Sequence, residues 1–284
     1  MTRPTLAASW GLAIAVAFIP SGRALAAQEL PTYLRDRGTG VRTSLLGSYV
    51  RQGELAIYTF YEYYADRNLE YKPSELGYGL NKDFRGRYRA SEGLLFFGYG
   101  LTHDIVLELE GAVISAELRK SPSDTATVPA RIRESGLGDV EGQIRWRFQR
   151  ETETRPELFT YFGTVLPLQK SRKIIGTQDL EHFFGIGLVR GFRWGTLTVR
   201  TAGGYDHGTK QFDAGEYAIE WLRRLSPSWK VIAAIEGNQI DEVSLLTEVQ
   251  WFINRHAVIK INNALGLTPN ATDFAPEVGI LFSF

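Results

Sequence analysis

Charged residues that recur at every second position of apolar segments are the part of this sequence whose pattern indicates chemistry. Side chains alternate between the two faces of a strand, so these charges share one face. A basic residue facing lipid at the bilayer midplane would cost about 2–4 kcal/mol, so a membrane barrel must turn this face inward. The residues expected to line its lumen are Glu62, Glu108, Glu110, Glu141, Arg145, Arg147, Arg200, Glu220, Lys230, Glu236, Glu248, Lys260 and Glu277. Such a lumen is either a polar path or an interior closed by salt bridges.

Residue spacings typical of enzymes are missing from the sequence. No His stands two residues before a Ser, as a lipase of the outer-membrane type requires. Asp206 and His207 are adjacent, so on one strand they would point to opposite faces. Four scattered His and the lack of Cys give no metal-ligand spacing. We therefore expect no catalytic residue, no metal and no cofactor, and we do not expect an enzyme.

The last stretch, Phe274 to Phe284, shows the alternation most clearly. One face carries Phe274, Val278, Ile280, Phe282 and Phe284, and the other carries Ala275, Glu277, Gly279 and Ser283. A membrane β-strand needs this division into an apolar and a small or polar face. The ending resembles the closing strand of bacterial outer-membrane barrels. That resemblance implies recognition of the C-terminal strand by the barrel-assembly machinery of a Gram-negative cell.

Eleven further segments alternate in the same way, and an even total lets both termini lie on one side of the membrane. They are Glu54 to Tyr64, Ala90 to Tyr99, Asp104 to Leu118, Leu137 to Gln149, Glu157 to Pro167, Glu181 to Phe192, Thr196 to Asp206, Asp213 to Arg224, Trp229 to Gly237, Glu242 to Phe252 and Ala257 to Leu267. The predicted fold is all-β, a single up-and-down antiparallel transmembrane barrel of about 12 strands over residues 54–284. A soluble β-sandwich is the alternative that strand spacing alone leaves open.

Aromatic residues favour the barrel. Trp and Tyr prefer membrane interfaces, where an apolar ring and a polar N–H or O–H are both satisfied. The residues expected as anchors at one interface are Trp146, Trp194, Trp221, Trp229, Trp251, Phe282 and Phe284. A sandwich has no reason to gather its Trp residues at one end.

The N-terminus indicates export. Residues 1–26 contain Arg3, an apolar run and Ala24-Leu25-Ala26, which predicts a cleaved signal peptide. Its removal leaves two more acidic than basic residues, a balance that gives no support for a nucleic-acid partner. Residues 27–53 are expected to form a periplasmic lead-in, although Thr43 to Val50 could form another strand. The predicted location is the outer membrane.

Basic residues gather near the three longest expected outer connections. They are Arg85, Arg87, Arg89, Arg131, Arg133, Lys170, Arg172 and Lys173. Arg and Lys pair well with phosphate, so lipopolysaccharide and outer-membrane lipid are natural partners. Ordinary solvated loop charge explains the same residues equally well.

The most distinctive local motif is Ser135-Gly136-Leu137-Gly138-Asp139-Val140, followed by Gln143-Ile144-Arg145-Trp146-Arg147-Phe148. It resembles the strand entry of the outer-membrane transporter family associated with the phenol meta-cleavage pathway. The resemblance implies a barrel that takes up small organic molecules. From the residues alone, Asp139 can accept backbone N–H bonds or face the lumen. The expected function is a porin-like channel for passive uptake of small polar or organic solutes. The alternatives are a non-conducting structural or lipopolysaccharide-contacting barrel and, third, a lipid-modifying enzyme.

Overall fold

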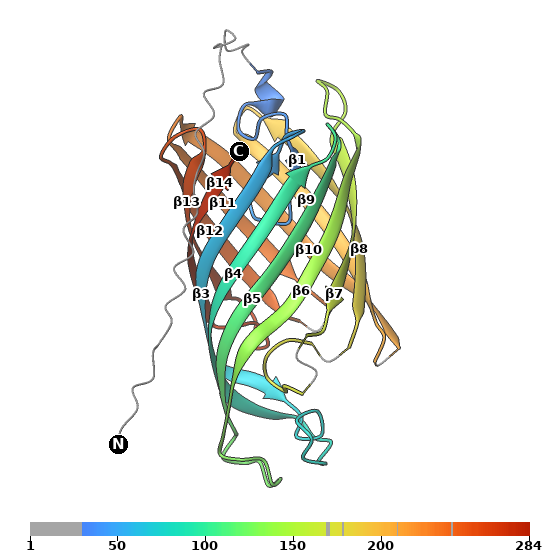
Figure 1. The fold of residues 1–284 in the computed structure, drawn as a ribbon, viewed down its shortest axis with the longest axis vertical. Helices are drawn as coiled ribbons and strands as arrows, with labels where there is room; N and C mark the ends of the chain where they lie inside the picture. Colours follow the sequence, from blue (N-terminus) through green and yellow to red (C-terminus); the bar gives the residue numbers. More distant parts are fainter. Residues whose placement is uncertain (1–29, 169–170, 178, 209, 240) are drawn as a thin grey trace, which may run out of the picture.

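A closed antiparallel barrel of twelve strands makes up most of the molecule (Figure 1). The structure is a computed structural model that describes residues 30–168, 171–177, 179–208, 210–239 and 241–284. The predicted fold class is confirmed, whereas the predicted signal peptide, residues 1–26, lies outside the described residues. The strands are β3 Leu55–Tyr71, β4 Phe84–Gly100, β5 Ile105–Arg119, β6 Arg131–Gln149, β7 Glu157–Leu166, β8 Glu181–Phe192, β9 Gly195–Asp206, β10 Gln211–Ser226, β11 Trp229–Gly237, β12 Val243–Phe252, β13 Ala257–Gly266 and β14 Phe274–Ser283.

Pairing between the first and last barrel strands removes the sheet edges. Each other pair is formed by strands adjacent in sequence, and β14 pairs antiparallel with β3. At the end of this seam, Leu55 and Phe284 exchange two backbone hydrogen bonds of 3.1 and 3.0 Å. The C-terminal Phe is therefore part of the closure, and the barrel leaves no edge on which another chain could add. In the described residues, no helix is long and apolar enough to cross a membrane.

The two ends of the barrel differ in their connections. At one end, which we call the turn end, tight turns such as Arg193–Trp194 and Pro227–Ser228 join the strands, and the C-terminus lies there. The opposite loop end carries the longer connections. There β3 continues past Tyr64 and β4 begins before Ala90, so both strands include residues that we expected in the loop between them. Tyr71 and Phe84 explain the extension, because they pack in a buried cluster beyond the main barrel.

Alternation divides the barrel wall into an apolar outside and a polar inside. In β6, Trp146 and Phe148 are 51% and 42% exposed, whereas Arg145 and Arg147, which alternate with them along the strand, are 2% and 6% exposed. Large apolar side chains such as Val113, Phe184 and Ile261 are more than half exposed around the outer surface. A soluble protein would not present so continuous an apolar surface to water, whereas a lipid bilayer covers it.

Residues 30–53, which we call the inner segment, enter the barrel from the turn end (Figure 1). The segment contains a short 3-10 helix, η1 Thr32–Leu34, and a separate two-stranded sheet of β1 Val41–Arg42 and β2 Tyr49–Val50. The stretch from Thr43 to Val50 therefore adds no strand to the barrel. Val41 and Val50 are buried against Ala56 of β3 and Val106 of β5.

Candidate functional site in the barrel interior

Every residue predicted to line the lumen is buried or half-buried, and several of them are joined in pairs. Glu108 accepts from Arg145 Nε at 3.2 Å, Glu236 accepts from Arg200 Nη2 at 2.9 Å, and Glu248 lies 3.4 Å from Lys260 Nζ. Register places Glu110 opposite Glu141 and Glu62 opposite Glu277. The remaining members, Arg147, Glu220 and Lys230, contact the inner segment or its neighbours.

One buried ion pair joins the inner segment to β10. Arg42 donates through Nη2 to Glu220 Oε2 at 2.5 Å, and the two side chains are 3% and 2% exposed. Burial lowers the pKa of Arg42, but the surrounding groups, with the Glu220 carboxylate foremost, together outweigh that effect and raise the pKa above its ordinary value. Burial also raises the pKa of the nearby Tyr49 hydroxyl, which keeps it neutral. Arg42 is therefore a permanent cation that needs Glu220 as its counter-charge.

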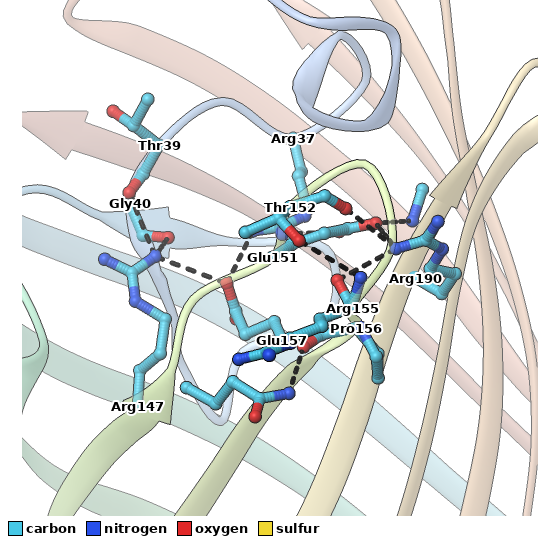
Figure 2. Close-up of polar contacts among 12 residues, drawn as sticks. Arg37, Thr39, Gly40, Arg147, Glu151, Thr152, Arg155, Pro156, Glu157 and Arg190 are labelled. Carbon is cyan, nitrogen blue, oxygen red and sulfur yellow. Dashed lines mark hydrogen bonds and ion pairs between the residues drawn. The ribbon is translucent and has the colours of Figure 1, made fainter.

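A second network fastens the segment to the β6–β7 side of the wall (Figure 2). Glu157 Oε2 accepts from Arg37 at 3.0 Å and from Arg147 at 3.3 Å, so one carboxylate joins both sides. Arg147 also donates to the backbone oxygens of Thr39 and Gly40 at 3.1 and 3.0 Å. Burial opposes the charge of Arg37, yet the surrounding groups, with the Glu157 carboxylate foremost and the Glu151 carboxylate among them, together leave its pKa raised.

Glu151 completes this network from the turn between β6 and β7. Its carboxylate accepts from Arg37 Nη2 at 2.9 Å and from the backbone N–H of Gly191 at 2.8 Å (Figure 2). Arg190 of β8 in turn donates to the backbone oxygens of Thr152 and Arg155 at 2.9 and 2.8 Å. The inner segment is thus held by β6, β7 and the turn between them, and β8 supports that turn.

Lysines hold the other side of the segment. Lys230 Nζ donates to the Gly47 oxygen and Lys260 Nζ to the Leu46 oxygen, each at 3.1 Å. Ser44 is bonded through its hydroxyl to Glu108, and its backbone N–H donates to the same carboxylate at 2.9 Å. The contacts reach opposite walls, so the segment crosses the lumen rather than lying along one strand.

The predicted interface anchors lie at the turn end. Trp146, Trp194, Trp229, Trp251, Phe282 and Phe284 are between 36% and 57% exposed, and Trp221 is half-buried. Trp229 and Trp251 stack with centroids 6.0 Å apart, and Trp221 Nε1 donates to the Trp194 oxygen at 3.3 Å. An apolar face towards lipid with the indole N–H satisfied is the arrangement that an interface favours.

Two cavities lie on either side of the inner segment. The larger, which we call the loop-end cavity, measures about 520 Å³ and reaches from Arg42 and Ser44 towards the loop-end residues Asp213 and Gln239. The smaller measures about 390 Å³ and is lined at the turn end by His103 and Arg150, and by residues of the segment itself that include Thr39 and Arg51. The inner segment is therefore the partition between them.

No protein-family model and no curated protein matches the sequence. Among solved structures, the fold is similar to that of an outer membrane channel from Pseudomonas putida F1, with a TM-score of 0.59 and 12% identity over 83% of this chain and 97% of that chain. The chain shares its barrel fold with this channel. The resemblance to outer-membrane barrel proteins expected from the sequence is thereby confirmed.

Two other solved structures are similar at lower scores. The translocator domain of the autotransporter NalP from Neisseria meningitidis has a TM-score of 0.47 and 9% identity, over 82% of this chain and 89% of that one. The Ralstonia pickettii toluene transporter TbuX has a TM-score of 0.39 and 10% identity, over 82% of this chain and 88% of that one. At these identities the comparisons concern the fold alone.

Several interior residues escaped the sequence analysis. Alternation on β4 and β7 could have revealed Glu92 and Tyr161, because they share a face with buried residues of the same strands. Arg37 and Arg42 carried no such signal, since they precede the barrel strands. Asp139 of the distinctive motif accepts the backbone N–H of Thr177, so the motif fixes the loop between β7 and β8. In the described residues, no group of three His, Asp or Glu side chains is placed to hold a metal ion.

Proposed function

We propose that the protein is a porin-like channel of the outer membrane for passive uptake of small polar or organic solutes. The observation that carries the proposal is a charged interior with two cavities inside a barrel whose outer surface is apolar. The fold shared with an outer membrane channel supports it. In the proposed channel the turn end faces the periplasm and the loop end faces the cell exterior. The protein reaches the outer membrane after export and removal of residues 1–26.

In the proposed channel the inner segment blocks the path through the lumen. A solute that crosses from the loop-end cavity to the turn-end cavity must displace residues 30–53, because these residues line both cavities. Their attachment consists of side-chain ion pairs and hydrogen bonds to the wall, such as Arg42 with Glu220 and Lys230 with Gly47. Such contacts can be broken without disturbing the ladder of any barrel strand.

Conductance of the refolded protein in a planar bilayer tests the channel. Arg42→Gln removes the buried ion pair, so we expect discrete ion-current steps that are more frequent than in the unchanged protein. Arg51→Gln is the matched control, because Arg51 lies in the same segment but its side chain is 69% exposed and pairs locally with Glu54. If both variants fold but neither conducts ions across the bilayer, the proposed channel function is wrong.

A lipopolysaccharide-contacting barrel is the second candidate, and a patch at the loop end favours it. Glu117 of β5 is bonded or paired to Arg119 at 2.6 Å, to Arg131 at 3.3 Å and to Arg133 at 2.8 Å. Register places Arg87 and Arg89 of β4 beside them. One carboxylate cannot neutralise this group of exposed arginines, and phosphate groups of the outer leaflet supply the missing negative charge.

A further inference from the structure

The inner end of the loop-end cavity carries a buried cation with an unused donor. Arg145 Nε donates to Glu108, and its guanidinium lies 4.5 Å from the ring centroid of Tyr161 and 5.3 Å from that of Phe159. The residue is 2% exposed, and within the described part of the chain its Nη1 has no hydrogen-bond partner. An unpaired buried donor is costly unless something else satisfies it.

Two more guanidinium groups line the same end of the cavity. Arg42 forms its floor, and Arg200, with a side chain 22% exposed, donates to Glu236 at 2.9 Å. A guanidinium has five N–H donors, so one glutamate does not exhaust any of these groups. A carboxylate with two acceptor oxygens matches this fork geometry.

The outer end of the cavity has the opposite charge. Glu141, Glu181, Asp213 and Glu216 line it, and among the described residues no Lys or Arg lines this end. The nearby His182 is bonded to the Thr164 hydroxyl at 2.9 Å. Acidic groups in a recess attract cations, so this end favours a positively charged group.

The two ends are close enough for one small molecule. Glu141 and Arg145 both line the cavity and stand four residues apart on β6, which corresponds to about 13 Å along a strand. The rings of Tyr161 and Phe183 line the same cavity. This length suits an aromatic ring or short chain with one charged group at each end.

We propose that the loop-end cavity binds a small dipolar solute, whose carboxylate contacts Arg145 and Arg200 and whose cationic group lies among Glu141, Glu181 and Glu216. The inference rests on the proposed channel function and names its solute class. A simple anion meets repulsion at the acidic end, and a simple cation meets it at the arginine end. Only a molecule with both charges satisfies both ends.

Isothermal titration calorimetry of the refolded protein in detergent tests this with three probes of matched size. They are 4-(aminomethyl)benzoate, which carries both charges, 4-methylbenzoate and 4-methylbenzylammonium. We expect the first to bind at least about tenfold more tightly than either of the others. Equal binding of all three probes, or no binding of the first, would overturn the proposal.

Two substitutions separate the ends of the cavity. Arg200→Gln should abolish the preference for 4-(aminomethyl)benzoate over 4-methylbenzylammonium. Glu216→Gln should abolish the preference for 4-(aminomethyl)benzoate over 4-methylbenzoate. Both side chains are partly exposed to solvent, so their replacement is compatible with folding. Glu70→Gln is the control, because Glu70 is an acid of the loop end that does not line this cavity. If neither cavity substitution changes probe preference, the assignment is wrong.

Ion-current measurements distinguish this inference from the channel itself. A barrel that conducts ions but does not distinguish the probes in calorimetry refutes the solute class and leaves the channel standing. A barrel that is silent in the bilayer but prefers the dipolar probe refutes the channel and supports the binding site. A conducting barrel whose current is blocked most strongly by 4-(aminomethyl)benzoate supports both.

Discussion

Arg42 and Glu220 are 178 positions apart in sequence, yet they form a 2.5 Å ion pair in the interior of the barrel. The pair joins the inner segment to β10, which lies five strands away from β3, the strand into which the segment leads. Breaking one half of a buried pair leaves the other charge without compensation, which costs more than replacing both halves.

Stability measurements on this pair should therefore be strongly non-additive. Arg42→Leu and Glu220→Leu alone should each lower the free energy of unfolding by about 3–5 kcal/mol, whereas the double variant should lose much less. Urea-induced unfolding of the protein in lipid vesicles provides the measurement. Additive losses would show that the two side chains do not depend on each other.

Glu157 should control release of the inner segment. Glu157→Gln removes the charge shared by Arg37 and Arg147, so we expect trypsin to cleave after Arg37 about tenfold faster or more. Arg37 has a side chain with 0% exposure in the intact protein. Glu153→Gln in the neighbouring turn is the control, and an unchanged cleavage rate in Glu157→Gln would contradict the role assigned to the network.

Asp104 should make the turn end sensitive to acid. Hydrogen bonds from Arg150, and then from Arg147, hold the pKa of Asp104 below its ordinary value. Its contribution to stability is therefore present above the unfolded pKa of about 3.9 and is lost as the pH falls through the lower folded pKa. Asp104→Asn should destabilise the protein at pH 7 but have no effect at a pH below the folded value.

Thermal unfolding as a function of pH measures this difference. Asp83→Asn is the control, because the Asp83 side chain at the loop end is 56% exposed. A constant difference between Asp104→Asn and the unchanged protein across the whole range would rule out the titration of Asp104 as its source.

Ile261 offers a test of the membrane-facing surface. It is 56% exposed and follows Lys260, which is 1% exposed on the opposite face of β13. Ile261→Lys should reduce folding into lipid vesicles by about 2–4 kcal/mol if the position lies near the bilayer midplane. Ile261→Leu should fold normally, and equal folding of the two variants would show that lipid does not cover this face.

Lipopolysaccharide should stabilise the loop end through the arginine patch. We expect Arg131→Gln with Arg133→Gln to weaken lipopolysaccharide binding about tenfold or more, because hydrogen bonds to charged groups are lost. Surface plasmon resonance on the refolded protein measures the affinity. Arg155→Gln at the turn end should leave it unchanged, and an equal loss in that control would indicate a merely non-specific charge effect.

The barrel could be predicted because its determinant is local. Arg145 and Trp146 are neighbours in sequence on opposite faces, so period two alone separates inside from outside. The extension of β3 to Tyr71 was missed because it depends on packing with Leu118 and Val128, which lie far along the chain. The inner segment was missed for the same reason, since nothing near Arg42 reveals Glu220 as its partner.

The inner segment contacts residues of β5, β6, β7, β10, β11, β12 and β13. All of these contacts can exist together only when each strand is already in place. Hairpins close short loops and form first, whereas contacts across long stretches of chain form last. We therefore expect the inner segment to become ordered last, and protection of its amides in hydrogen exchange should mark the completed barrel.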